Sequence, residues 1–560
     1  MNAHAATAHT RITPAPATVR THTRSVVGPL IRFRFRRDRV RVPVWVLVFA
    51  FTALFVAAAL AKTYGDPAER LAVLRVLATD PTLLALRGAP DGNSSGGFFV
   101  VEIGSYLLLM VALMNSFLAV RHSRADEEDG QAELIAATQA GRAASTVATI
   151  IHLVIVNILV GLATAVAMMA VGYDAAGSLL LGWSLACTGL VFCAVGLVMS
   201  QIFSSARAAN GWSSALIGVA WVANAAANSQ GTVASDGLQV TPGALDWFTP
   251  VGWGMLIRPY TANNPLPGLL SLAFAVILLA TSFALQSSRD AAAGLVQPRA
   301  GRSWASGALH EPIGLAWRLQ RGPILGWGIG SLLGAVAVGG LGKTLSDAVS
   351  GNPQLGAAVQ AMANGGGSLL ESFLGVMMAL IGLFVSAASL QTVMRMRQEE
   401  ARGTAESVLV TRVPRLRWYF SFVGLALGAA AVTLFLSGLV AGLALAGIDS
   451  RLVGQAIVLA LGQLPAVAVY VSLTAFAFAT VPPATIPFGW TLLGLGLVVG
   501  EYGTLLGMPE WLRNLAPGGH TVVAPLANAD WSGTWVMSLL SLAVIAAAAW
   551  LFRRRSLTTV

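Results

Sequence analysis

The sequence predicts an all-α polytopic membrane protein. We expect about twelve transmembrane helices in two parallel six-helix repeats, each with a short cytoplasmic helix between its second and third helices. The 560 residues are 56% hydrophobic and only 11% charged, against about 25% charged in soluble domains. Apolar runs long enough to cross a hydrocarbon core of roughly 30 Å recur along the chain. An acidic loop sequence also occurs twice, which predicts an internal duplication.

The first repeat is expected over residues 28–286, after a polar, Thr- and Ala-rich segment (1–27) predicted to be a disordered cytoplasmic tail. Residues 28–42 alternate Arg with apolar residues. This pattern favours an elbow at the membrane interface that contacts anionic lipid, although ordinary basic flanking of the first helix would give the same composition. The expected helices are 43–62, 97–120, 146–172, 175–203, 208–228 and 266–286.

The second repeat is expected over residues 322–560, after a cytoplasmic linker (287–321) whose end has the composition of a second, shorter elbow. Its expected helices are 322–342, 369–394, 418–447, 453–480, 484–503 and 531–552. Short matches occur in the same order in both halves, such as Asn210-Gly-Trp212 and Phe488-Gly-Trp490. A common order supports parallel repeats.

The basic residues indicate the orientation. With both termini in the cytoplasm, 27 of the 35 Lys and Arg residues fall on the cytoplasmic side, as the positive-inside rule requires. They lie at the ends of apolar segments and form no continuous patch, so the net charge of +10 does not indicate nucleic-acid binding. We therefore expect a multi-pass protein of a bacterial cell membrane.

The duplicated loops contain most of the clustered acids. Arg124 begins the first copy and Arg397 the second, 273 positions later. Gly130 and Gly403 would allow a sharp turn into a short helix with one apolar stripe and an acidic flank. Such a helix suits a cleft rimmed by basic residues on a partner. The alternative is a solvated loop whose acids pair with nearby Arg, but duplication in register favours docking. The candidate docking residues are Asp126, Glu127, Gly130, Glu133, Thr138, Glu399, Glu400, Gly403, Glu406 and Thr411.

The second copy, Glu400-Ala-Arg-Gly403-Thr404-Ala405-Glu406, followed by Val413-Pro414-Arg415, closely resembles the loop between helices two and three of ABC-2 type transport permeases. The double-length chain resembles the actinobacterial branch of polyketide-antibiotic, tetronasin-type multidrug exporters. The first copy matches less well, because Gln131 replaces the Thr of this pattern.

The resemblance implies that both loops are coupling helices seated on two copies of a separate ABC ATPase. The chain would then be the transmembrane subunit of an exporter that moves hydrophobic or amphipathic compounds (antibiotics, drugs or lipids) out of the cell by alternating access, and would contribute to antibiotic resistance. Its partners would be the ATPase, membrane lipid and small amphipathic cargo, with no nucleic acid. This chain would carry no cofactor, since ATP and Mg would bind the ATPase.

Enzymatic activity is not indicated by the sequence. Residues 337–344 fit a permissive phosphate-loop pattern, but they end a membrane helix on the predicted outer side and lack the required strand–loop–helix setting. Cys187 and Cys193 lie six residues apart in one apolar segment and are interpreted as core residues. We expect no catalytic residue and no metal site. The alternative function is an ion-coupled secondary transporter with two six-helix halves, but such a transporter should have acids in mid-membrane positions.

Seven polar or aromatic residues are candidates for a substrate path. They are Glu102, Asn115, Trp212, Asn224, Glu371, Trp490 and Glu501. Burying an acid at a helix centre costs about 2.5–3.5 kcal/mol, so intramembrane acids are functional candidates. The acids would either line an outward vestibule for cationic drugs or simply reach water at the interface. The amides would bind cargo or join helices, and the two Trp would line the path or belong to an aromatic belt.

Overall fold

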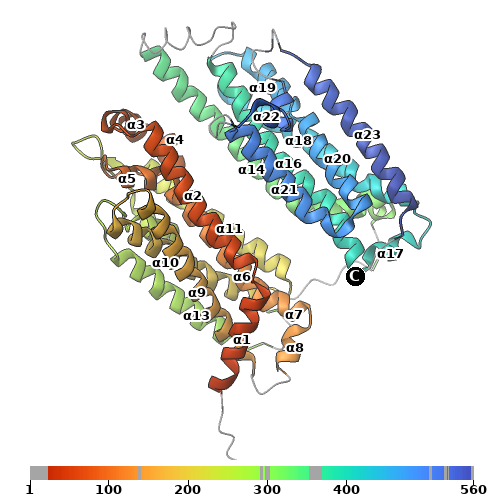
Figure 1. Cartoon of the computed structure of the whole chain (residues 1–560), viewed down its shortest axis with the longest axis horizontal. Coiled ribbons are helices and arrows are strands. Elements are labelled where there is room, and N and C mark those ends of the chain that lie inside the picture. The colour runs from red at the N-terminus through yellow and green to blue at the C-terminus, as the bar shows by residue number, and fades with distance from the viewer. Residues whose placement is uncertain are drawn as a thin grey trace, which may run out of the picture. The chain divides into compact units, whose positions relative to one another are not determined.

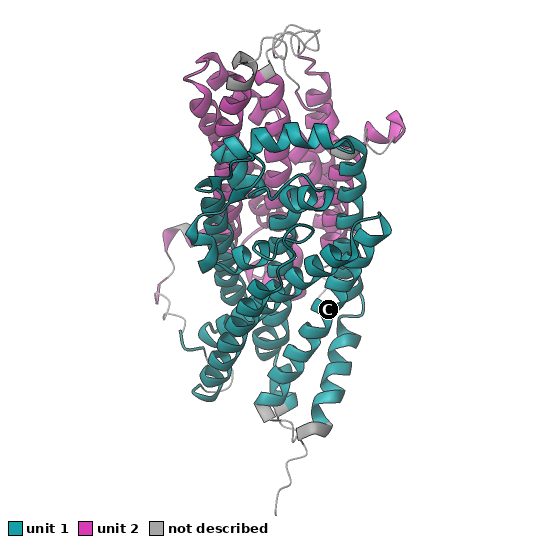
Figure 2. Ribbon diagram, turned by 90° about the vertical axis from the view of Figure 1, so that its left-hand side faces the viewer, with its two compact units in different colours: residues 1–300 teal, residues 301–560 magenta. Residues whose placement is uncertain are grey.

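The computed structural model divides the chain into two compact units, residues 1–300 and 301–560 (Figure 2). The sequence predicted a division within the linker 287–321. Each unit is built almost entirely from helices (Figure 1). The structure describes residues 23–136, 141–289, 294–296, 303–304, 306–351, 369–503, 508–522, 526 and 529–556. The predicted N-terminal tail therefore lies mostly outside the described residues.

Unit 1 contains the elbow helix, the predicted membrane helices and several short elements. Its elements are α1 (Thr23–Arg37), α2 (Arg41–Thr63), α3 (Pro67–Thr79), α4 (Pro81–Arg87), α5 (Ser95–Phe99), the π-helix η1 (Val100–Gly104), α6 (Ser105–Val120), the π-helix η2 (Arg121–Ala125), α7 (Asp126–Glu128), α8 (Gln131–Ala136), α9 (Gly141–Ala170), α10 (Ala175–Ile202), α11 (Ala206–Ser229), β1 (Thr232–Val233), β2 (Val240–Thr241), η3 (Ala244–Phe248), α12 (Pro250–Met255) and α13 (Leu266–Ser287).

The described part of unit 2 consists mostly of long helices. Its elements are η4 (Gly307–His310), α14 (Pro312–Gly351), α16 (Leu369–Ala401), α17 (Thr404–Leu409), α18 (Arg415–Leu445), α19 (Arg451–Leu461), α20 (Leu464–Thr480), η5 (Pro482–Ala484), α21 (Thr485–Tyr502), α22 (Glu510–Arg513), η6 (Pro517–His520) and α23 (Ser532–Arg554). The stretch predicted as a second elbow forms the first turns of α14. The predicted helix 453–480 is divided into α19 and α20 just before Pro465, which cannot donate a helical hydrogen bond.

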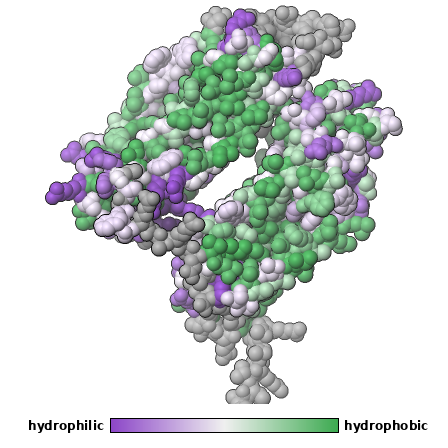
Figure 3. Space-filling model, turned by 180° about the vertical axis from the view of Figure 1, so that it is seen from behind, coloured by the Kyte–Doolittle hydropathy of each residue, from purple (hydrophilic) through white to green (hydrophobic). Residues whose placement is uncertain are grey.

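Eleven helices in the described part of the chain are long and apolar enough to cross a membrane. They coincide with eleven of the twelve predicted spans. The other prediction, 208–228, does form a helix, α11, but this helix is not among the eleven. Its Asn and Ser residues make it less apolar than the eleven, so the twelfth span stays a prediction. Figure 3 shows apolar side chains over the sides of the helices and hydrophilic ones near their ends.

Small residues bring the helices of unit 1 together. A Cβ on Gly161 of α9 would lie 2.7 Å from the carbonyl oxygen of Gly182 in α10, so these two backbones are in direct contact. Large side chains such as Phe49, Phe99 and Phe192 fill the remaining core. Small residues at crossing points are typical of membrane helix packing, where close approach maximises dispersion contacts.

The two longer connections of unit 1, residues 63–96 and 229–265, fold against each other at the end of the unit where α6 begins. Asp91 forms an isolated antiparallel bridge with Gln239, and Val240 N–H donates to the carbonyl oxygen of Pro90 at 2.8 Å. β1 and β2 form a two-stranded antiparallel sheet beside this bridge. These connections therefore form a folded layer opposite the end that carries α7 and α8.

Candidate functional site

The first acidic loop follows α6 without a break. α6 continues through η2 into α7, and the chain reverses at Gly130 before α8. Gly130 has φ of 72°, and its N–H donates to the carbonyl oxygen of Glu127 at 3.2 Å. A left-handed backbone favours glycine, because other residues lose about 1 kcal/mol or more there. The predicted sharp turn is therefore present.

The second acidic loop has the same turn, 273 residues later. α16 ends at Ala401, Gly403 has φ of 72°, and α17 begins at Thr404. The N–H of Gly403 donates to the carbonyl oxygen of Glu400 at 3.0 Å. Glu127 and Glu400 thus occupy equivalent positions, three residues before the left-handed glycine. One backbone geometry serves both sequence copies.

Glu127 is bound on both carboxylate oxygens by arginines of its own unit. Arg124 Nη1 lies 2.6 Å from Oε2, and Arg289 Nη2 lies 2.6 Å from Oε1. Arg289 follows the last helix of unit 1, α13, by two residues. Its Nε also donates to Oε1 of Gln201, near the end of α10, at 2.7 Å. The carboxylate therefore connects the loop to the ends of α10 and α13.

Glu400 makes the corresponding contact in unit 2. Its side chain is 1% exposed, and Arg555 binds it through two parallel hydrogen bonds of 2.7 and 2.8 Å. Arg555 directly follows α23, the last helix of unit 2. Its guanidinium carbon lies 5.0 Å from the ring centre of Phe478 near the end of α20, and 5.6 Å from that of Phe552. A bidentate Arg–carboxylate pair fixes orientation as well as distance.

The two acids that precede these glutamates are also paired within the chain. Asp126 is buried and contacts Arg37 at the end of α1. Glu399 contacts Arg395 one turn earlier, and Thr404 Oγ1 donates to it at 2.6 Å. The sequence proposed these acids for a partner contact, with local arginine pairing as the alternative. The structure pairs them with arginines of this chain.

Only part of each loop remains open to solvent. Glu133 and Glu406 are exposed, as are Leu134 (74%) and Val410 (86%). Ala405 is buried, and Val408 and Leu409 pack against the core of unit 2. Thr411 is exposed, with its hydroxyl bonded to the carbonyl oxygen of Val408. Thr138 lies outside the described residues.

Asn115, a candidate for the substrate path, is fully buried between α6 and α9. Its amide exchanges two hydrogen bonds with Asn157, of 3.0 and 2.6 Å. Each amide nitrogen also donates to a carbonyl oxygen one turn earlier. A Cβ on Gly189 of α10 would lie 2.1 Å from Oδ1 of Asn157. Asn115 therefore joins helices, which was the alternative interpretation from the sequence.

Asn224 is likewise buried, and its amide donates to Oδ1 of Asp246 at 2.6 Å. Asp246 is 1% exposed, and its Oδ2 has no hydrogen-bond partner among the described residues. Burial raises the pKa of Asp246 to about 6, against the hydrogen bond from Asn224 and the charge of Arg258, which lower it. Asp246 lines a hollow of about 440 Å³, and Arg258, ion-paired with Asp91 at 3.3 Å, lines it too.

The remaining candidates for the substrate path contact different neighbouring residues. Glu102 pairs with Arg87, and Glu371 accepts from Gln455 Nε2 at 2.5 Å. Trp212 is 56% exposed and stacks on Phe203, whereas Trp490 is 41% exposed. The side chain of Glu501 lies outside what the structure describes. The hydrogen bonds and ion pairs described here for Asn115, Asn224, Glu371 and Glu102 are all made with residues outside the candidate set.

A buried cluster of Asp38, His122 and His152 was missed by sequence reasoning. His122 Nε2 lies 2.5 Å from Oδ2 of Asp38, and His152 Nε2 lies 3.4 Å from the same atom. Burial opposes ionisation of Asp38, but the hydrogen bonds from the two histidines hold its pKa well below its usual range. Their sequence positions are too far apart for any spacing motif, and His152 alone lies within a predicted apolar helix.

The cluster has three atoms of metal-ligand type within 4.8 Å of one another. Arg41 and Arg121 lie 3.6 and 3.4 Å from the other carboxylate oxygen of Asp38. This surplus of positive charge disfavours a divalent cation. We interpret the cluster as the anchor that holds the α1–α2 corner against α6 and α9, and our prediction of no metal site stands untested.

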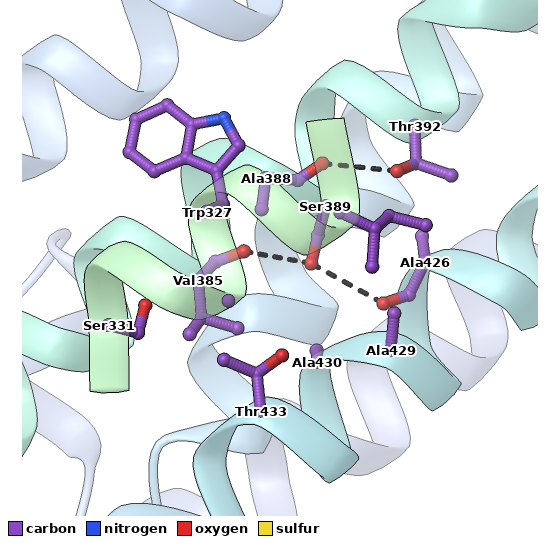
Figure 4. Close-up of a pocket in the computed structure, with 12 residues that line it drawn as sticks. Trp327, Ser331, Val385, Ala388, Ser389, Thr392, Ala426, Ala429, Ala430 and Thr433 are labelled. Atoms are coloured by element: carbon purple, nitrogen blue, oxygen red, sulfur yellow. Dashed lines mark hydrogen bonds between the residues drawn. The ribbon is translucent and has the colours of Figure 1, made fainter. Parts of the chain in front are cut away.

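Unit 2 contains an apolar hollow of about 260 Å³ between α14, α16 and α18 (Figure 4). Small residues line it, and Ser389 Oγ donates to the carbonyl oxygens of Val385 and Ala426. Trp327 lies at its edge and donates to Gln391 at 3.3 Å. The hydroxyl is thus satisfied by backbone, and the hollow offers mainly apolar contacts.

Comparison with known proteins agrees with a membrane transport function. A protein-family model described as "Multidrug efflux system permease Rv1217c, C-terminal domain" matches residues 309–553. Over 536 residues the chain is 33% identical to the multidrug efflux system permease protein Rv1217c of Mycobacterium tuberculosis (strain ATCC 25618 / H37Rv), and the alignment covers 94% of both chains.

Proposed function

We propose that this chain, which belongs to the family of the multidrug efflux permease Rv1217c, is the membrane subunit of an ABC exporter. Separate ATPase subunits would power it. Family membership and eleven candidate membrane helices identify a multi-pass efflux permease. The ATPase partnership goes beyond this, and it rests on the two acidic loops. The proposed cargo is hydrophobic or amphipathic, as expected for a multidrug permease.

The observation that carries the proposal is that each loop has one glutamate paired within the chain and one exposed to solvent. Glu127 and Glu400 are ion-paired with arginines of their own unit, whereas Glu133 and Glu406, three residues after each left-handed glycine, face solvent. An exposed acid beside an exposed Leu134 or Val410 suits an apolar cleft with a basic rim. Because both loops have this arrangement, two equal partners can be engaged.

The proposed mechanism is alternating access. Binding of ATP would close the two ATPase subunits, and their approach would move both loops and the helices attached to them. ATP and Mg would remain on the ATPase, and this chain would act as a permease without enzymatic activity. Both termini would lie in the cytoplasm of a bacterial cell, which places the two loops on the side that contains ATP.

Co-purification tests the proposed contact. The chain is co-expressed with an ABC ATPase encoded beside it, and the complex is compared with that of the Glu133→Arg plus Glu406→Arg double variant. A matched control reverses two exposed acids in α3 and α22, Glu69→Arg plus Glu510→Arg. We expect loss of the ATPase from the first variant alone. If wild type binds no ATPase, or both variants bind equally, the proposed contact is wrong.

An ion-coupled secondary transporter is the second candidate. The observation that favours it is the buried carboxyl of Asp246, whose pKa of about 6 would allow proton exchange near neutral pH. This candidate requires no ATPase, and its transport would stop when the proton gradient is collapsed. ATP dependence of transport therefore separates the two candidates.

A further inference from the structure

We propose that Arg289 and Arg555 are positioning residues that fasten each acidic loop to the last membrane helix of its own unit. This inference rests on the proposed function, because it assigns the path by which a movement of the loop reaches the helices. Arg289 follows α13 and binds Glu127, whereas Arg555 follows α23 and binds Glu400. Neither arginine belongs to the loops in which the duplication was recognised.

The pairing persists although the two halves differ in length. Glu127 and Glu400 are 273 positions apart, but Arg289 and Arg555 are only 266 apart. The chain between the two partners therefore differs by seven residues, and the same ion pair still forms. An incidental surface contact has no reason to survive such a change. The feature that both units share is therefore the ion pair between loop and helix end, and the number of residues between its partners is not fixed.

Burial makes these connections stiff. The exposed fractions of the side chains are 19% for Glu127, 5% for Arg289, 1% for Glu400 and 13% for Arg555. Buried charges separate only at a high cost, because each loses its partner in a medium of low dielectric constant. The loop and the end of the last helix should therefore move together when either is displaced.

Each arginine also contacts the end of a second membrane helix. Arg289 binds Gln201 near the end of α10, and the guanidinium of Arg555 lies over Phe478 near the end of α20. α10 packs along α13, and α20 packs along α23. The arginine thus sits where a pair of packed helices meets the loop. The arginine therefore contacts an amide in unit 1 and an aromatic ring in unit 2, at the same place relative to the loop.

Each acidic loop would then transmit movement from a bound partner to the membrane helices. On one side of the left-handed glycine the glutamate is tied to the membrane helices, and on the other side the exposed Glu133 or Glu406 is available to a partner. Displacement of α8 or α17 would be passed through the glutamate to α13 or α23. Loss of the arginine should leave the partner-binding face intact and interrupt this transmission.

Charge exchange tests the inference in the full complex with the ATPase. The variants are Arg555→Glu, Glu400→Arg and their combination, with the same set for Arg289 and Glu127. The matched control is the exposed pair of Arg417 and Glu311 in unit 2, whose side chains are 59% and 49% exposed at 2.6 Å. Measured quantities are bound ATPase, ATP turnover and export of ethidium per ATP, each per folded protein from size exclusion.

We expect the single variants to bind the ATPase and hydrolyse ATP but to export at least tenfold less ethidium per ATP. The exchanged pair should recover export, and the control should not change it. Unchanged export in the single variants, or no recovery in the exchanged pair, would overturn the inference. Where a charge-reversed variant does not fold, Arg555→Gln and Arg289→Gln take its place with the same expected uncoupling. If wild type binds no ATPase, the proposed function fails first, which is a different result.

Discussion

Replacement of Glu400 with Gln is expected to destabilise unit 2 far more than the same change at an exposed glutamate. Glu400 is 1% exposed and accepts two hydrogen bonds from Arg555, which is itself 13% exposed. The substitution leaves the guanidinium charge buried without its counter-charge. Breaking one side of a buried pair costs about 3–5 kcal/mol.

We expect the free energy of unfolding to fall by ~3 kcal/mol, the lower end of that range, because Arg555 keeps its contacts with the rings of Phe478 and Phe552. Such cation–π contacts offset part of the loss. The control is Glu311→Gln, since the pair of Glu311 and Arg417 is about half exposed and surface pairs contribute ~0–1 kcal/mol.

The assay is equilibrium unfolding of the purified chain in mixed micelles of rising SDS content, followed by circular dichroism. A difference of about 2 kcal/mol between the two variants corresponds to roughly a 30-fold difference in the unfolding equilibrium. If Glu400→Gln and Glu311→Gln unfold within about 0.5 kcal/mol of each other, a margin typical of surface substitutions, the pair does not hold the loop, and our reasoning about its burial is wrong.

Three further predictions concern single positions and use the same unfolding assay. Gly130→Ala should lower the free energy of unfolding by about 1 kcal/mol, because φ of 72° is unfavourable for alanine, although a Cβ there meets no atom within 4 Å. Gly28→Ala, which also has open space but a negative φ, should lower it less. Equal losses would contradict the argument. Gly189→Ala should push apart the Asn115–Asn157 pair and cost ~1–3 kcal/mol, with Gly218→Ala, which meets nothing within 4 Å, as the tolerated control. Burial raises the pKa of Asp246 to about 6, so this carboxyl binds its proton more tightly in the folded state, and its contribution to stability is present at low pH and lost between the unfolded pKa of ~3.9 and about 6. Asp246→Asn should remove this decline of up to ~3 kcal/mol in the free energy of unfolding. An unchanged pH profile would show that the carboxyl does not titrate in this range.

Features that depend on local pattern were predictable from the sequence. Eleven of the predicted spans are membrane-length helices, because long apolar runs have no other stable structure in a bilayer. The left-handed turns at Gly130 and Gly403 followed from the repeated glycine, since few other residues accept that backbone. α11 also forms as a helix where one was predicted, but its Asn and Ser residues make it less apolar than those eleven.

Features that depend on tertiary contact were not predictable. Arg289 and Arg555, which bind Glu127 and Glu400, lie 162 and 155 residues away from them, and no local period links these pairs. Asp38, His122 and His152 meet only because the α1–α2 corner, η2 and α9 pack together. The same holds for Asn224 and Asp246, whose contact depends on how residues 229–265 fold.

Transport into inverted membrane vesicles tests the central claim most directly. Vesicles contain the chain with its ATPase, the chain alone, or the chain with an ATPase variant that cannot hydrolyse ATP, and uptake of ethidium is measured with ATP present or with only a proton gradient. We predict uptake that requires ATP and the active ATPase and that persists after a protonophore is added. Uptake by the chain alone, driven by the gradient and abolished by the protonophore, would contradict the account and favour the ion-coupled transporter.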